Sequence, residues 1–182
     1  MQVTADVFSL DNKTLLHKDT PADVPANGVV TATHLDLAPL EKDAVILAKL
    51  ELKDQSGKVV SSNLYWLAGE SQDFRQLTRL AAPAVTATAS AKLDGANMRI
   101  QVELKNTGDD VALQNKLTLI GSSDGRRILP AYYSDNYVSL LPGETRHIEV
   151  EYPVSAAGSA APAFTLRGFN LPQQTVPVAV GR

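Results

Sequence analysis

The stretch SDNYVSLLPGE, residues 134–144, joins a polar cluster to a turn that separates two apolar runs. Pro142 followed by Gly143 is typical of a type II turn, because proline fixes φ at the second position and glycine accepts the positive φ required at the third. Apolar residues precede this pair, and the alternating run TRHIEV follows it. The stretch therefore predicts two β-strands joined by a tight corner.

The polar part of the same stretch has two interpretations, a ligand-binding cluster or a structural bend. Asp135 and Asn136 have short side chains that hydrogen-bond nearby backbone groups and so fix the bend that leads into the strand. Tyr137 is then placed to bury its ring and to donate its hydroxyl to a backbone carbonyl, as a corner tyrosine does. The structural interpretation is favoured: these three residues, with Pro142 and Gly143, are predicted to form a corner.

Around this corner, the second half of the chain is a succession of short alternating runs separated by turn residues. The runs cover residues 85–93, 97–106, 111–120, 126–140, 145–154, 161–169 and 174–180. In the run 97–106, for example, Met98, Ile100, Val102 and Leu104 fall on one face of a strand. About seven strands with short turns in under a hundred residues are the signature of an immunoglobulin-like sandwich, which is predicted for residues 85–182.

The first part of the chain shows the same β pattern but holds fewer strands. Alternating runs cover residues 2–8 and 28–37, and a hairpin covers 44–67 with its turn at 54–57. We count about five strands in residues 1–68, whereas a free-standing sandwich usually needs seven. The sequence therefore predicts an immunoglobulin-like sandwich that is truncated at its N-terminus and lacks strands of a longer chain.

Residues 69–84 lose the alternation and are interpreted as a packed linker between the two domains. Phe74, Leu77 and Leu80 recur every third residue, and Asp73 is placed to cap a short helical turn. A short and partly apolar linker packs instead of swinging freely. The residues predicted to make the interdomain contact are Tyr65, Trp66, Leu77 and Leu80.

The bulk composition excludes several classes of function. The 182 residues carry 17 Lys and Arg against 20 Asp and Glu, without a basic stripe, so nucleic acid is not an expected partner. No apolar run approaches the roughly 20 residues that span a bilayer, so a membrane partner is not expected either. There is no cysteine, which excludes disulfides, thiolate metal sites and cysteine nucleophiles.

Catalysis by this chain alone is not expected. The three histidines, His17, His34 and His147, are far apart and do not occur in a metal-binding motif. Aspartates and glutamates lie in turns and on exposed strand faces instead of forming an evident acid/base pair. We therefore predict no catalytic residue, no metal site and no cofactor.

The residues of the corner also carry a family resemblance. YYSDNYVSLLPGETRHIEVEY, residues 132–152, resembles the C-terminal immunoglobulin-like domain of glycoside hydrolase family 2 enzymes of the exo-β-D-glucosaminidase and β-mannosidase branch. The hairpin LELKDQSGKVVSSNLYWLA (50–68) is similar to the end of the preceding domain in that family, and DFRQLTRL (73–80) to the linker. In LRGFN, Phe169 stands where relatives often carry tryptophan.

This resemblance implies a fragment of a larger enzyme. In that family a catalytic (β/α)8 barrel precedes two C-terminal sandwiches and supplies the acid/base and nucleophile glutamates, and no position here matches either of them. The chain is accordingly expected to be a non-catalytic accessory region that stabilises or frames the barrel. Its expected partners are the barrel and other domains of the parent enzyme, with carbohydrate bound only through the parent, which is expected to be a bacterial periplasmic or secreted protein.

Two other functions remain open from the sequence: a carbohydrate-binding module that acts alone, and a cell-surface adhesion sandwich. Exposed, coplanar aromatic rings would favour the carbohydrate-binding module. A large apolar patch rimmed by polar residues would favour the accessory region, since it would match a missing neighbour. A homodimer in isolation is a further expectation, because a sheet with a missing neighbour exposes unpaired backbone groups.

Overall fold

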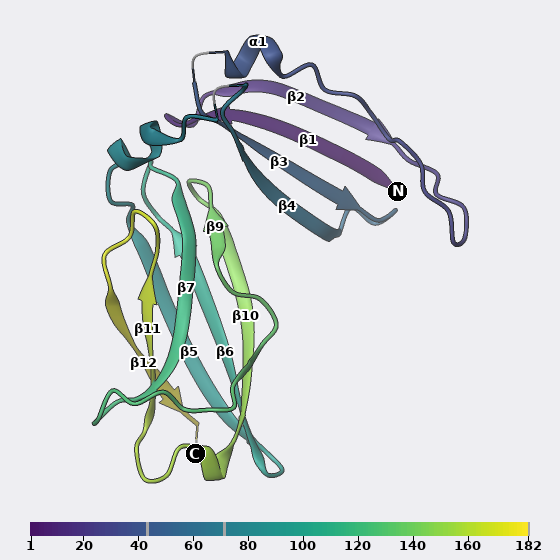
Figure 1. Cartoon of the computed structure of the whole chain (residues 1–182). Helices are drawn as coiled ribbons and strands as arrows, with labels where there is room; N and C mark the ends of the chain where they lie inside the picture. Colours follow the sequence, from purple (N-terminus) through teal and green to yellow (C-terminus); the bar gives the residue numbers. More distant parts are fainter. Residues whose placement is uncertain (43, 71, 182) are drawn as a thin grey trace. The chain divides into compact units, whose positions relative to one another are not determined.

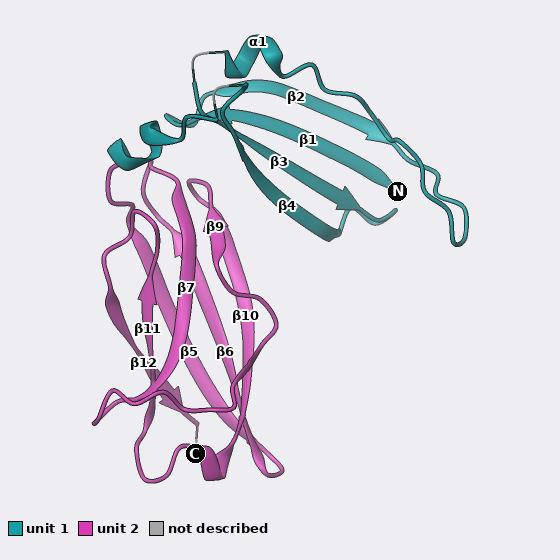
Figure 2. Ribbon diagram, viewed as in Figure 1, with its two compact units in different colours: residues 1–80 teal, residues 81–182 magenta. Residues whose placement is uncertain are grey.

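The computed structural model describes residues 1–42, 44–70 and 72–181 of the chain and is almost entirely β (Figure 1). It divides into two compact units, Met1–Leu80 and Ala81–Arg182, which Figure 2 shows in different colours. The sequence predicted a separate linker at 69–84, whereas its first twelve residues belong to unit 1 and its last four to unit 2.

Unit 2 is a two-layered sandwich. Its strands are β5 (Val85–Asp94), β6 (Asn97–Asn106), β7 (Ala112–Gly121), β8 (Tyr132–Tyr133), β9 (Val138–Leu140), β10 (Thr145–Pro153), β11 (Pro162–Arg167) and β12 (Gln174–Val180), with a 3-10 turn, η2 (Val154–Ala156), after β10. They follow one another in the order β8-β10-β6-β5-β12-β11-β7-β9. A short parallel pairing of β12 with β5 joins the two layers, and the other pairs are antiparallel.

The core of unit 2 lies between these layers and follows the predicted alternation. Ile100, Val102 and Leu104 of β6 point inward and are buried, while Gln101 and Glu103 between them are exposed. Phe164 and Leu166 of β11 come from the opposite layer and belong to the same buried cluster. Burial of each large aliphatic or aromatic side chain contributes about 1.5–3 kcal/mol, so this cluster is the main source of the unit's stability.

The long strand predicted at 126–140 does not form, which corrects the sequence interpretation. Only β8 and β9 are regular within it, and Arg127 makes an isolated bridge to Ile120. Pro130 cannot donate a ladder hydrogen bond. Tyr137 has a φ of 58°, which is incompatible with an extended strand, so the chain turns there before β9 begins.

Unit 1 contains a single antiparallel sheet of four strands, in the order β2-β1-β3-β4. The strands are β1 (Gln2–Ser9), β2 (Thr14–Pro21), β3 (Ile46–Lys53) and β4 (Val59–Leu67), and the unit also holds α1 (Ala38–Glu41) and η1 (Arg75–Arg79). The hairpin of β3 and β4 turns as predicted, with Gly57 at a φ of 84°. Asp54 accepts hydrogen bonds from the Ser56 and Lys58 N–H groups and so holds this turn.

The two faces of this sheet differ in polarity. One face carries Val7, Ile46 and Ala48, which pack with Leu37 and Leu40 of the segment around α1. The opposite face carries linked polar groups, which include the pairs Thr4–Asp19, Asp6–His17, Lys49–Glu51 and Lys53–Glu51. This second face is not uniformly exposed, because Leu47 and Thr4 on it are buried.

The strand predicted at residues 28–37 is wrong: the structure assigns no strand there. The segment has the period-two alternation of a strand, but it takes part in none of the β-ladders among the described residues of unit 1. Val29 is 98% exposed. Alternation alone does not make a strand, because the backbone also needs a neighbour with which to pair.

The 3-10 helix η1 packs on unit 1. Leu77 is buried, and the side chain of Gln76 accepts a hydrogen bond from the Val45 N–H at 3.3 Å. Before the helix, Asp73 accepts hydrogen bonds from the Arg75 guanidinium and from its N–H group, and these lower the pKa of Asp73 to about 2. Residues 73–80 are thus held locally by both apolar and ionic contacts.

Candidate functional site

Asn136 is the centre of the predicted corner. Its Oδ1 accepts a hydrogen bond from the Leu117 N–H at 2.9 Å, and its Nδ2 donates to the Leu117 carbonyl at 3.0 Å. The same Oδ1 accepts the N–H of Tyr137, and Asp135 accepts the N–H of Asn136. The prediction that Asp135 and Asn136 fix this bend through backbone hydrogen bonds is confirmed.

The Pro142–Gly143 turn also forms as predicted. The Glu144 N–H donates to the Leu141 carbonyl at 3.1 Å, and Gly143 has a φ of 79°, as the third position of a type II turn requires. The Glu144 carboxylate accepts the Leu141 N–H across the turn. Buried Asn106 anchors the turn from β6, because its backbone exchanges hydrogen bonds with Gly143 and Glu144.

Tyr137 is not buried, which contradicts the predicted corner tyrosine. It is 56% exposed, and its φ of 58° directs it away from the core. The tyrosine of this region that packs against the core is Tyr133, which is partly buried and whose hydroxyl accepts the Leu119 N–H at 2.8 Å. Tyr133 precedes the bend at Asn136 and Tyr137 follows it. Because the chain turns between them, Tyr133 faces the core and Tyr137 faces solvent.

Tyr137 instead contributes to a cationic surface on the outside of unit 2. The Lys116 ammonium lies over its ring, 5.1 Å from the centroid. The hydrogen bond from Lys116, followed by the positive charges of Lys116, Arg167 and Arg127, lowers the pKa of the Tyr137 hydroxyl. Lys116 and Arg167 are register partners on β7 and β11, so the two strands place their charges side by side.

Three asparagines that the sequence did not single out also bind backbone groups of unit 2 through their side-chain amides. Asn115 is buried in β7, and its Nδ2 donates to the carbonyls of Ala112 and Val138. Asn170 donates to the Val111 carbonyl and accepts the Leu113 N–H, and Asn106 donates to the Leu140 carbonyl. A polar amide among inward-facing apolar residues, as in ALQNKLTL, was the signal that could have identified Asn115.

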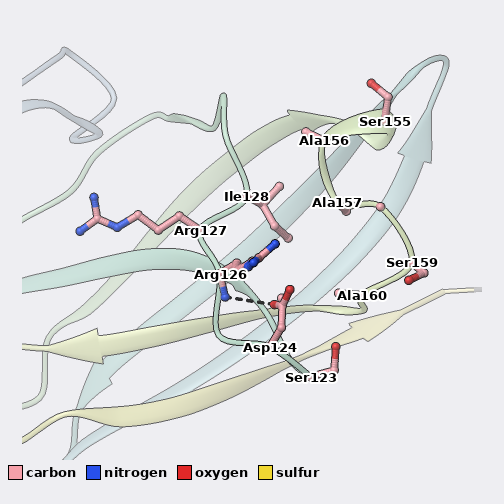
Figure 3. A pocket seen from close by; sticks show the side chains of 12 residues that line it. Ser123, Asp124, Arg126, Arg127, Ile128, Ser155, Ala156, Ala157, Ser159 and Ala160 are labelled. Atoms are coloured by element: carbon pink, nitrogen blue, oxygen red, sulfur yellow. Dashed lines mark hydrogen bonds between the residues drawn. The ribbon is translucent and has the colours of Figure 1, made fainter.

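A polar pocket of about 430 Å³ lies where the loop after β7 meets the loop before β11 (Figure 3). Serines, Asp124 and Arg126 line it, and Asp124 accepts the Arg126 N–H at 3.0 Å. Arg127 also belongs to the lining, but its side chain extends away from the other labelled residues in Figure 3. None of the lining residues is aromatic, so the pocket lacks the flat surface on which a sugar ring stacks.

The histidines and carboxylates do not converge on a catalytic centre within the described residues. His17 contacts Asp6 at 2.6 Å on the polar face of unit 1, and the hydrogen bond to Asp6 raises the pKa of His17. His147 lies 3.8 Å from Glu103 on the exposed side of β10. The part of the chain that the structure describes holds no group of three or more His, Asp or Glu able to bind a metal.

The four residues predicted at the interdomain contact all lie in unit 1. Tyr65 and Trp66 are neighbours on β4 and face opposite sides of the sheet, with Tyr65 48% exposed. Leu77 is buried within the unit, and Leu80, its last residue, is half-buried. Their contact with unit 2 remains a prediction. Among residues 1–42, 44–70 and 72–181 there is no helix with the length and apolar character that a bilayer crossing requires.

The fold and these structural side chains define a chain of two immunoglobulin-like domains in tandem, of which unit 2 is a β-sandwich and unit 1 contains a single four-stranded sheet. Residues 63–171, more than half of the chain, match the family Exo-beta-D-glucosaminidase Ig-fold domain, and residues 1–69 match the family Mannosidase Ig/CBM-like domain. The chain therefore belongs to the immunoglobulin-fold domains of exo-β-D-glucosaminidases, as the resemblance of residues 132–152 indicated. The predicted all-β class is confirmed by the same matches.

Individual relatives agree with this assignment. The chain is 36% identical to an exo-β-D-glucosaminidase of Streptomyces avermitilis over 155 residues, which cover 73% of this chain and 17% of the relative. It is 31% identical to an exo-β-D-glucosaminidase of Arthroderma benhamiae, over 83% of this chain and 19% of the relative. The crystal structure of the exo-chitosanase of Amycolatopsis orientalis superimposes with a TM-score of 0.80 and 28% identity, covering 97% of this chain and 23% of that chain.

The chain thus spans less than a fifth of the length of these curated relatives. Its matched families are both immunoglobulin-like, and it corresponds to a non-catalytic accessory region of an exo-glucosaminidase. The catalytic activity named for the relatives belongs to proteins of which the aligned part makes up only 17% and 19%.

Proposed function

We propose that this chain stabilises the catalytic domain of a longer β-glycosidase and frames the entrance to its active site. The observation that carries the proposal is the match of both parts of the chain to immunoglobulin-like families, together with alignments that cover only 17% and 19% of two longer relatives. The described side chains support it, because the amides of Asn106, Asn115 and Asn136 tie loops to strands. Such hydrogen bonds hold the loops rigidly and do not supply a catalytic group.

The parent enzyme that we propose cleaves β-D-glucosaminides. Relatives that align over 73% and 83% of the chain carry the name exo-β-D-glucosaminidase, whereas the endo-β-mannosidase of Lilium longiflorum matches only 40% of it. We also propose that the parent acts in the periplasm or outside the cell, which fractionation of the source cells would test. A parent confined to the cytosolic fraction would contradict that location.

The exposed aromatic surface of unit 2 does not favour a separate module for amino sugars. The Lys116 ammonium covers one face of the Tyr137 ring, and Arg167 and Arg127 add positive charge around it. A glucosamine polymer is cationic when its amino groups are protonated, so this surface repels the protonated polymer. The accessory role is therefore preferred to the independent carbohydrate-binding module.

The lack of catalysis by the isolated chain is tested with p-nitrophenyl β-D-glucosaminide, β-D-mannoside and β-D-galactoside. We expect no release of nitrophenol above the buffer rate, because no acid/base pair of carboxylates is identified in the described residues. Turnover that persists at constant specific activity through repurification would contradict the proposal. A longer parent protein serves as the positive control for the assay.

A further inference from the structure

Residues 28–37 have the sequence of a strand but lack a strand's hydrogen bonds. Among the described residues, no N–H group from Val29 to Asp36 donates to another backbone group. Val29 and Val30 are 98% and 39% exposed, which is unusual for two consecutive β-branched apolar residues. The segment is tethered to the sheet by the Lys18 ammonium, which donates to the His34 carbonyl at 3.2 Å.

The sheet that this segment adjoins has an apolar face that is unevenly covered. Near α1 the face is closed, because Leu37 and Leu40 pack with Val7 and Ile46. Toward the start of β1 the same face continues through Val3 and its register partner Leu52, and through Leu50, all three of which are only half-buried. A sheet with one apolar face is stable when a second layer covers that face.

The direction of the chain fixes how a second layer would form. The Ala22 N–H donates to the Met1 carbonyl at 2.9 Å, so the segment 22–37 leaves the sheet beside the start of β1. It then returns to α1, which packs at the other end of β1 (Figure 1). Residues 28–37 therefore run in the same direction as β1.

A strand that lies over this face and leads into Met1 must run in the opposite direction. It would arrive at the Met1 end, where β1 begins, and would therefore be antiparallel to residues 28–37. Antiparallel strands exchange hydrogen bonds directly and need only short connections. The unpaired N–H groups of residues 29–36 and the half-covered face are thus complementary to the same incoming strand.

We infer that residues 28–37 are an acceptor for a strand of the parent protein that immediately precedes β1 and that pairs with them antiparallel to form a second layer. This inference rests on the proposed function, since it requires a longer parent. The incoming strand alternates apolar and polar residues, with its apolar side chains toward Val3, Leu50 and Leu52. The match of residues 1–69 to the Mannosidase Ig/CBM-like domain and the far greater length of the relatives argue for a strand from the same chain.

Hydrogen exchange measured by mass spectrometry on both this chain and the parent protein tests the inference. In this chain, amides of residues 29–36 should exchange at close to the rate of an unstructured peptide. In the parent they should exchange at least about tenfold more slowly, while amides of β6 keep the same rates in both proteins. Equally fast exchange of residues 29–36 in the two proteins would overturn the inference.

A proline substitution provides a second, independent readout. Thr31→Pro removes an N–H group that has no backbone acceptor in this chain, so the melting temperature of this chain should not change. The same substitution in the parent should break the added pairing and increase exchange across residues 29–36 to the rate of this chain. Ala26→Pro, in the exposed turn before the segment, is the matched control and should leave both proteins unchanged.

A second copy of the chain is the competing occupant. Protection of residues 29–36 that increases with the concentration of this chain, together with a dimer in sedimentation, would assign the acceptor to a homodimer and overturn the inference. None of these outcomes depends on glycoside hydrolysis by the isolated chain. A failure of the strand acceptor is therefore distinguishable from a failure of the proposed accessory function.

Discussion

The carboxamide of Asn136 takes the place of a strand residue opposite Leu117, accepting from its N–H and donating to its carbonyl. β7 thus pairs with a side chain where the backbone between β8 and β9 turns away. The interaction explains how a chain can bend at residues 135–137 without leaving the polar groups of Leu117 unsatisfied.

Substitution of Asn136 should therefore be costly. Asn136→Ala leaves the partly buried N–H and carbonyl of Leu117 without partners, and we expect a loss of about 2–3 kcal/mol in the free energy of unfolding. Asp135→Ala is the matched control at the neighbouring exposed position and should cost less than about 1 kcal/mol. Denaturant unfolding monitored through unit 2 measures both values, and equal costs would contradict the role assigned to Asn136.

Substitutions of the two tyrosines of this region, Tyr133 and Tyr137, should affect stability differently. Tyr133→Phe removes the acceptor of the Leu119 N–H and should cost about 0.5–1.5 kcal/mol, whereas Tyr137→Phe should have little effect on stability. Tyr137→Gly should be neutral or stabilising, because glycine adopts the positive φ of this position without strain. A cost above about 2 kcal/mol for Tyr137→Gly would show that the exposed ring has a structural role.

The interaction between His17 and Asp6 can be tested by measuring the pKa of His17. The hydrogen bond to Asp6 raises the pKa of His17 in the folded state, so we expect an NMR titration midpoint above the roughly 6.5 of an unstructured peptide. Asp6→Asn should lower this midpoint. In the unsubstituted protein, the contribution of the His17–Asp6 interaction to folding stability is fully present below the pKa of His17 in the unfolded state. It is lost as the pH rises through the pKa of His17 in the folded state. A midpoint unaffected by Asp6→Asn would exclude the ion pair in solution.

The comparison of two alternating segments shows which part of the fold could be read from the sequence. Residues 97–106 and residues 28–37 both alternate, but only the first forms a strand, because β5 and β10 lie on either side of it. A local pattern gives the faces of a strand and does not reveal whether a partner is available. The hairpin of β3 and β4 was predictable since its turn and both of its strands are adjacent in sequence.

At the corner, the turn could be predicted from the sequence but the orientation of a side chain could not. The turn at Pro142 and Gly143 follows from the conformational preferences of those two residues, and the structure contains it. The orientation of Tyr137 depends on a left-handed backbone conformation, which is rare for an aromatic residue and is fixed here by Asn136. Such a conformation depends on the tertiary contact with Leu117, which no local pattern contains.

We propose that these domains support a catalytic domain located elsewhere in a longer protein. The most direct test compares the parent enzyme with a variant that lacks the region corresponding to this chain, by the half-life of thermal inactivation on p-nitrophenyl β-D-glucosaminide. Loss of a packed neighbour destabilises the folded catalytic domain and accelerates its unfolding, so we expect the half-life to fall at least about tenfold. A shortened enzyme with the half-life and turnover of the complete parent would contradict the account.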